Sequence, residues 1–84
     1  MVVFVGRAGS GWALQFQDEK NPFHEPYKKV AELGVVLEIC DYCSEEFNVK
    51  GKLSDQQRTL LSGDYEGHPS LVRWIEKGYH VLIL

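Results

Sequence analysis

The chain of 84 residues is long enough for one compact core and too short for two, since domains commonly run to about 100 to 150 residues. We therefore predict a single domain over residues 1–84. A composition of 44% hydrophobic and 25% charged residues excludes an intrinsically disordered chain. The net charge of −3, with lysine and arginine scattered, gives no electrostatic reason to bind nucleic acid. Because neither an apolar run of about 20 residues nor a signal-peptide pattern is present, we expect a cytoplasmic protein without a membrane partner.

Continuous apolar runs predict three strands, over residues 2–5, 35–39 and 79–84. Runs without polar alternation are typical of strands that are covered on both faces, as in parallel sheets. Residues 59–61 could add a short fourth strand.

Helical patterns lie between these strands. Apolar residues three and four apart predict a helix over residues 26–33, after a loose turn at 22–25. The segment before the last strand is the best marked, because Pro69 and Gly78 are the residue types that open and follow a helix.

The remaining segments predict shorter elements. Residues 44–49 resemble a short helix, and Ser54 with Gln57 resembles a capping box. Residues 12–16 fit either a strand or a helical turn, of which we favour the turn. Strands that alternate with helices imply right-handed crossovers. The sequence therefore predicts a small three-layer α/β domain with a mainly parallel sheet of three to four strands and flanking helices.

Three segments should meet at the carboxyl edge of this sheet, where folds of this class bind ligands. They are a glycine-rich loop at residues 6–11, the turn at residues 40–44 and the approach to the last helix at residues 65–68. Candidate ligand-binding residues are Gly9, Ser10, Gly11, Asp41, Tyr42 and Gly67. The loop matches no phosphate-binding pattern, and a tight turn is its simpler interpretation. Asp41 is more simply a helix cap.

Cys40, Cys43 and His68 are the candidate catalytic residues. Cys40 ends an apolar strand and precedes a helix start, a setting that lowers a thiol pKa and exposes a nucleophilic thiolate. The alternative is a buried cysteine that acts as a small hydrophobe. Cys43 lies at the spacing of dithiol redox motifs. His68 could stabilise a thiolate or move a proton, or simply cap the last helix.

The same pattern predicts neither a metal site nor another cofactor. There is one cysteine pair, at positions 40 and 43, and no histidine pair at ligand spacing, so a zinc site is not expected.

Four segments, GVVLEIC at residues 34–40, FNVK at 47–50, YEGHPSL at 65–71 and EKGY at 76–79, form a pattern that covers essentially the whole chain. This pattern resembles the DsrE/DsrF-like family, which includes sulfur-relay subunits. In those members the cysteine that ends the corresponding strand carries a persulfide, and that position falls on Cys40. The resemblance therefore implies a sulfur carrier with donor and acceptor protein partners.

The resemblance also implies a homo-oligomer, because relatives commonly assemble as trimers or hexamers. Family members usually begin with a further strand and helix, which have no counterpart before residue 2. We expect an uncovered sheet edge, and unpaired edges favour association.

Three functional hypotheses remain open at this point. The leading one is sulfur transfer, in which the Cys40 thiolate takes the terminal sulfur of a donor persulfide and gives it to an acceptor thiol. The second is a dithiol oxidoreductase in which Cys43 resolves a mixed disulfide formed at Cys40. The third is a non-catalytic module that binds a small molecule at the loop edge or serves assembly.

Overall fold

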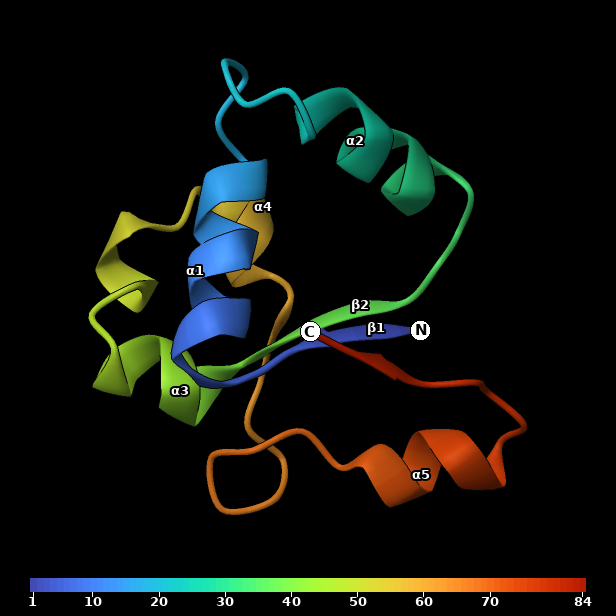
Figure 1. Cartoon of the computed structure of the whole chain (residues 1–84). Coiled ribbons are helices and arrows are strands. Elements are labelled where there is room, and N and C mark those ends of the chain that lie inside the picture. Colours follow the sequence, from blue (N-terminus) through green and yellow to red (C-terminus); the bar gives the residue numbers. More distant parts are fainter.

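The computed structural model describes residues 1–84 as an α/β fold with one parallel sheet. Its strands are β1 (Val2–Phe4), β2 (Leu37–Cys40), β3 (Leu61–Ser62) and β4 (Leu82–Ile83), in the order β3-β2-β1-β4. Its helices are α1 (Gly6–Phe16), α2 (His24–Glu32), α3 (Asp41–Glu46), α4 (Asp55–Arg58) and α5 (Leu71–Glu76), with a 3₁₀ turn η1 (Lys50–Lys52). The predicted fold class is confirmed (Figure 1).

Helices lie on both sides of the sheet, which gives the fold three layers (Figure 1). On one face the Phe4 ring of β1 contacts Phe16 of α1 and Tyr27 of α2, with centroids 6.2 and 6.3 Å apart. On the other face α5 is tied to β2, because Trp74 Nε1 donates a hydrogen bond of 2.9 Å to Glu38 Oε1. Neighbouring residues of a strand point to opposite faces of the sheet. β2 therefore contributes Ile39 to the core on the α1 side and Glu38 to the contact with α5.

The buried core lies on the face of the sheet covered by α1. It consists of Phe4, Ala13, Ile39, Val49 and Leu53, which come from β1, α1, β2 and the segments flanking η1. Removing such apolar surface from water contributes roughly 25 cal/mol per Å², so this cluster holds the segment after α3 against the sheet.

The glycine-rich segment at residues 6–11 is helical, so the predicted loop is wrong. α1 begins at Gly6, directly after β1, and buries Gly9 and Ser10. A Cβ at Gly9 would collide with the Leu84 carbonyl oxygen and lie 3.1 Å from the Phe4 carbonyl carbon. The glycine therefore lets α1 approach the backbone beside β1 and β4.

Two other helices begin at residues that differ from the prediction. α2 begins at His24 and includes Pro26 in its first turn, where a backbone N–H needs no intrahelical partner. α5 begins at Leu71, two residues beyond Pro69, so the proline precedes the helix and does not open it.

The edge strands are shorter and more exposed than the sequence suggests. A short fourth strand is confirmed as β3. It begins at Leu61, the last residue of the expected span 59–61, and ends one residue later at Ser62. β4 pairs through Leu82 and Ile83 with β1 alone, and these side chains are 57% and 54% exposed. The prediction that the last strand is covered on both faces is wrong, because both residues of β4, which point to opposite faces, are exposed.

The predicted cap at Ser54 is formed, and its partner has a second role. Ser54 Oγ accepts a hydrogen bond of 3.3 Å from the Gln57 backbone N–H. The Gln57 side chain donates to the Ala13 carbonyl at 3.1 Å and accepts from Tyr27 Oη at 2.8 Å. Gln57 thereby joins α4 to both α1 and α2.

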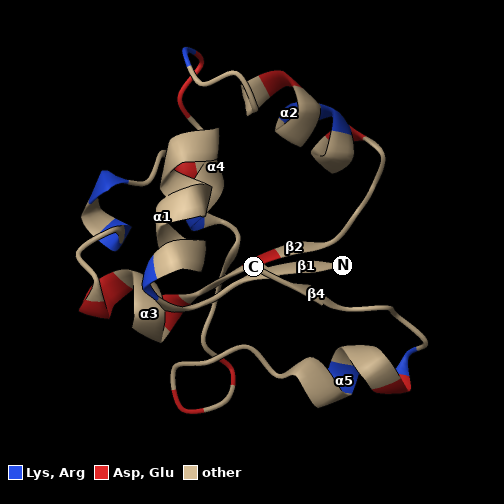
Figure 2. Ribbon diagram, viewed as in Figure 1, with Lys and Arg blue, Asp and Glu red and all other residues tan.

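Basic and acidic residues are interspersed along the helices and loops (Figure 2). Two ion pairs illustrate the mixing, Lys50 with Asp41 at 2.7 Å and Arg73 with Asp64 at 3.1 Å. No helix in the fold combines the length and the apolar character needed to cross a bilayer.

Trp74→Phe should destabilise the fold by about 1–3 kcal/mol, the usual cost of leaving a buried polar group without its partner. Glu38 is only 8% exposed and would keep Arg73 at 3.7 Å as its sole charged neighbour. Trp12→Phe is the matched control, since Trp12 is 44% exposed and its indole makes no hydrogen bond. Urea unfolding measures both, and equal losses would refute a specific role for the Trp74 contact.

Candidate functional site

The carboxyl end of β2 places Cys40 inside the protein. All of β2 is buried, and Cys40 itself is 0% exposed and aligned with Ser62 of β3. α3 starts at the next residue, earlier than the predicted start at residue 44, and Cys40 is its N-cap: the sulfur accepts a hydrogen bond of 3.4 Å from the Cys43 backbone N–H. The sulfur thus performs the capping role predicted for Asp41, whose carboxylate pairs with Lys50 instead.

A tight turn places His68 beside the Cys40 sulfur. The backbones of Tyr65 and His68 exchange two hydrogen bonds, of 2.9 and 2.8 Å, which close the turn. Gly67 has a φ of +87°, a conformation that glycine adopts without steric cost, and its carbonyl accepts a hydrogen bond of 2.9 Å from the Tyr42 N–H. His68 Nδ1 then lies 3.3 Å from Cys40 Sγ. His68 does not cap α5, which begins three residues later.

Cys43 and Tyr42 complete the surroundings of this pair. The ligand-type atoms of Cys40, Cys43 and His68 all lie within 4.8 Å of one another, and both cysteines are free. The Tyr42 ring is tilted against the His68 imidazole, with centroids 4.9 Å apart. Exposure increases outward, from buried Cys40 through half-buried Cys43 to exposed His68. We call these three residues the cysteine–histidine cluster.

The electrostatics of Cys40 differ from the prediction. Burial raises the pKa of its thiol to about 11, which outweighs the opposite effect of the Cys43 backbone N–H. The nearby Cys43 thiol acts in the same direction as burial. The lowered pKa predicted from the strand-end position is therefore wrong, because desolvation of a fully enclosed sulfur disfavours its charged form.

The predicted ligand-binding residues fall into two groups. Asp41, Tyr42 and Gly67 surround the cysteine–histidine cluster, whereas Gly9, Ser10 and Gly11 belong to α1. Gly9 faces Phe4 and Leu84, and Ser10 Oγ is buried without a hydrogen-bond partner. The glycine segment therefore packs against strands and does not join Cys40 in one edge pocket.

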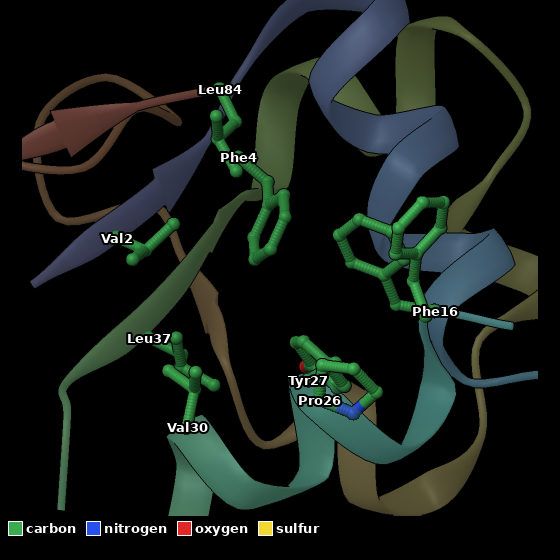
Figure 3. Close-up of a pocket in the computed structure, with 9 residues that line it drawn as sticks. Val2, Phe4, Phe16, Pro26, Tyr27, Val30, Leu37 and Leu84 are labelled. Carbon is green, nitrogen blue, oxygen red and sulfur yellow. The ribbon is translucent and has the colours of Figure 1, made fainter.

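A separate apolar pocket of ≈ 210 Å³ lies between the sheet and α2. Figure 3 shows side chains of Phe4, Phe16, Pro26, Tyr27, Leu37 and Leu84 around it. None of the predicted ligand-binding residues lines this pocket. The sequence reasoning missed it, although the aromatic residues at positions 16, 23 and 27 were the available signal.

Comparisons with known proteins identify a relative without a stated function. No family model matches the sequence, and no solved structure matches it. Over 73 residues, 87% of this chain, it is 32% identical to the uncharacterized protein MJ0733 of Methanocaldococcus jannaschii. The matched region is 56% of that relative, so the chain spans little more than half of its length.

Proposed function

We propose that this protein is a cytoplasmic sulfur carrier that holds a persulfide sulfur on Cys40. The observation that carries the proposal is the contact of 3.3 Å between Cys40 Sγ and His68 Nδ1 at the end of a buried strand. A cysteine beside an imidazole has an acceptor for its proton, which is the usual way in which a protonated thiol becomes a nucleophile. A reducing compartment keeps such thiols free.

The transfer step needs no external oxidant. The Cys40 sulfur attacks the outer sulfur of a donor persulfide, its S–S bond forms while the donor S–S bond breaks, and the donor leaves as a thiolate. His68 Nδ1 takes the Cys40 proton and returns it to the departing thiolate. Passing the sulfur on to an acceptor protein repeats this exchange in the other direction.

Access to Cys40 depends on His68. The sulfur is enclosed by the imidazole, the Gly67 carbonyl at 3.9 Å and the first turn of α3. His68 is exposed, so a donor that enters along the face of its ring would reach the sulfur while the imidazole stays in contact with it. The enclosure would also keep a bound persulfide away from water and stray thiols.

A dithiol oxidoreductase is the second candidate, favoured by one observation. The two cysteine sulfurs lie within 4.8 Å of each other at the cap and in the first turn of α3, a separation that a side-chain rotation could close to a disulfide. In that reaction the chain would lose two hydrogens, whereas a sulfur carrier gains one sulfur atom.

Intact mass after incubation of the reduced protein with a small-molecule persulfide tests the two candidates. A carrier gains the mass of one sulfur atom, and a reductant restores the original mass. A loss of two hydrogens without added sulfur would overturn the carrier in favour of the oxidoreductase. No mass change of either kind would reject both.

We also propose a homo-oligomer, and the family resemblance and the exposed edge strand β4 support it. Leu82 and Ile83 present apolar side chains beside unpaired backbone groups, which favours pairing with another copy. Light scattering at micromolar concentration should give at least twice the monomer mass of 9.6 kDa. A mass of 9.6 kDa throughout that range would contradict it.

A further inference from the structure

We infer that the cysteine–histidine cluster is a binding site for Zn²⁺, with Cys40 Sγ, Cys43 Sγ and His68 Nδ1 as its three protein ligands. Thiolates and imidazoles are the ligands that zinc prefers. The single cysteine pair in the sequence predicted no such site, because the third ligand comes from a turn 25 residues farther along and reaches the pair only in the folded chain. This inference does not depend on the sulfur-carrier proposal.

The positions of the ligand atoms fit a tetrahedral ion. Zinc bonds of about 2.3 Å to sulfur and about 2.0–2.1 Å to nitrogen separate neighbouring ligand atoms by roughly 3.5–3.8 Å. Cys40 Sγ and His68 Nδ1 are 3.3 Å apart, and no pair in the cluster exceeds 4.8 Å. A shift of about 1 Å by the half-buried Cys43 side chain closes the difference.

The backbone holds each ligand in place before any ion arrives. Cys40 and Cys43 occupy the cap and the first turn of α3, which brings both sulfurs to one side of the helix start. His68 is fixed by its paired hydrogen bonds with Tyr65 and by the Tyr42 ring. Such support of the first ligand shell is what metal sites require.

No basic side chain of the protein occupies the place of a cation in the cluster. No lysine or arginine makes a hydrogen bond to either sulfur, and Lys50, which follows α3, is paired with Asp41. Once the thiols are deprotonated, two thiolates in this enclosed position need a positive partner, and the protein supplies none. A divalent ion supplies that charge, and deprotonates the coordinating thiols as it binds.

Three protein ligands leave the fourth position to water or an external ligand. This is the arrangement of open zinc sites, whereas structural sites use four protein ligands. Zinc binding and sulfur transfer both use Cys40 Sγ, so each excludes the other. The zinc-bound state would hold the carrier inactive.

Titration of the reduced protein with Co²⁺, followed by displacement with Zn²⁺, tests the site. We expect one equivalent of Co²⁺ per chain, with thiolate-to-cobalt absorption that Zn²⁺ removes. Cys43→Ser and His68→Ala should each weaken binding by more than about 10-fold, since even changes around a metal's ligands cost about 10- to 100-fold. Both residues are accessible, so these variants are better tests than a change at buried Cys40.

His80→Ala is the matched control, because His80 is exposed and makes no side-chain hydrogen bond. Absence of thiolate absorption would overturn the site, and so would equal binding by His68→Ala and the wild type. The titration contains no persulfide, so its failure leaves the carrier proposal standing. Conversely, a protein that binds one Zn²⁺ and gains no sulfur when metal-free would reject the carrier alone.

Discussion

Cys40→Ser should gain no sulfur from a persulfide donor, whereas Cys43→Ser should gain one sulfur atom as the wild type does. A persulfide needs a single nucleophile, and a serine hydroxyl cannot form the S–S bond. Cys43 contributes a backbone N–H to the Cys40 sulfur, and that group is retained when its side chain changes. Intact mass followed by peptide mapping locates the added atom.

His68→Gln separates a role of His68 in proton transfer from a role in filling the space beside Cys40. Glutamine keeps a polar side chain in the turn and lacks an imidazole, so sulfur should arrive at Cys40 more slowly and to the same final extent. If Cys43→Ser traps mixed disulfides with the donor in place of one added sulfur atom, the pair is a redox dithiol. If sulfur is found on Cys43 while Cys40 stays unmodified, the carrier assignment to Cys40 fails.

Gly9→Ala should destabilise the protein by about 1–3 kcal/mol, the cost of overfilling a packed contact. Its new methyl group would meet the Leu84 carbonyl oxygen, so either α1 or the residue that follows β4 must move. The Leu84 carbonyl also accepts a hydrogen bond of 2.9 Å from the Val5 N–H, and that bond would be strained by the same movement. Urea unfolding measures the loss.

Gly11→Ala is the control within the same helix. A Cβ at Gly11 meets nothing within 4 Å, so the substitution should stabilise α1 by up to about 1 kcal/mol through helix propensity alone. Opposite signs at the two positions are expected. Equal stabilisation by both substitutions would show that α1 does not pack closely on the strand ends.

The sequence predicts the elements that are marked by a pattern of neighbouring residues. Apolar runs locate β1 and β2, and the parallel sheet follows from their alternation with helices. The glycines at residues 6–11 led to the wrong prediction of a loop, because glycine has a low helix propensity. One of them, Gly9, is required in α1 by its close contact with Leu84 at the far end of the chain. Tertiary contact of this kind overrides local preference and leaves no local signal.

Of the residues predicted to meet at this edge, Cys40, Cys43 and His68 lie together, whereas Gly9, Ser10 and Gly11 lie in α1. The strand end, the cysteine spacing and the position of His68 at one sheet edge all follow from the order of elements. The burial of Cys40 does not follow from the order of elements, because it depends on how the turn at Gly67 folds over the sulfur. Burial reverses the expected direction of the Cys40 pKa shift, and no spacing pattern encodes that enclosure.

The edge position of β4 has a consequence for how the molecule opens. α5 has no buried residue, and β4 is hydrogen-bonded to β1 alone. Residues 71–84 can therefore detach in a sub-global fluctuation that breaks the Trp74 contact with Glu38, while β3, β2 and β1 stay paired. Cys40, Cys43 and His68 all precede this unit in the chain. Backbone amides at the C-terminus would exchange with solvent from an open state in which the cluster is still assembled.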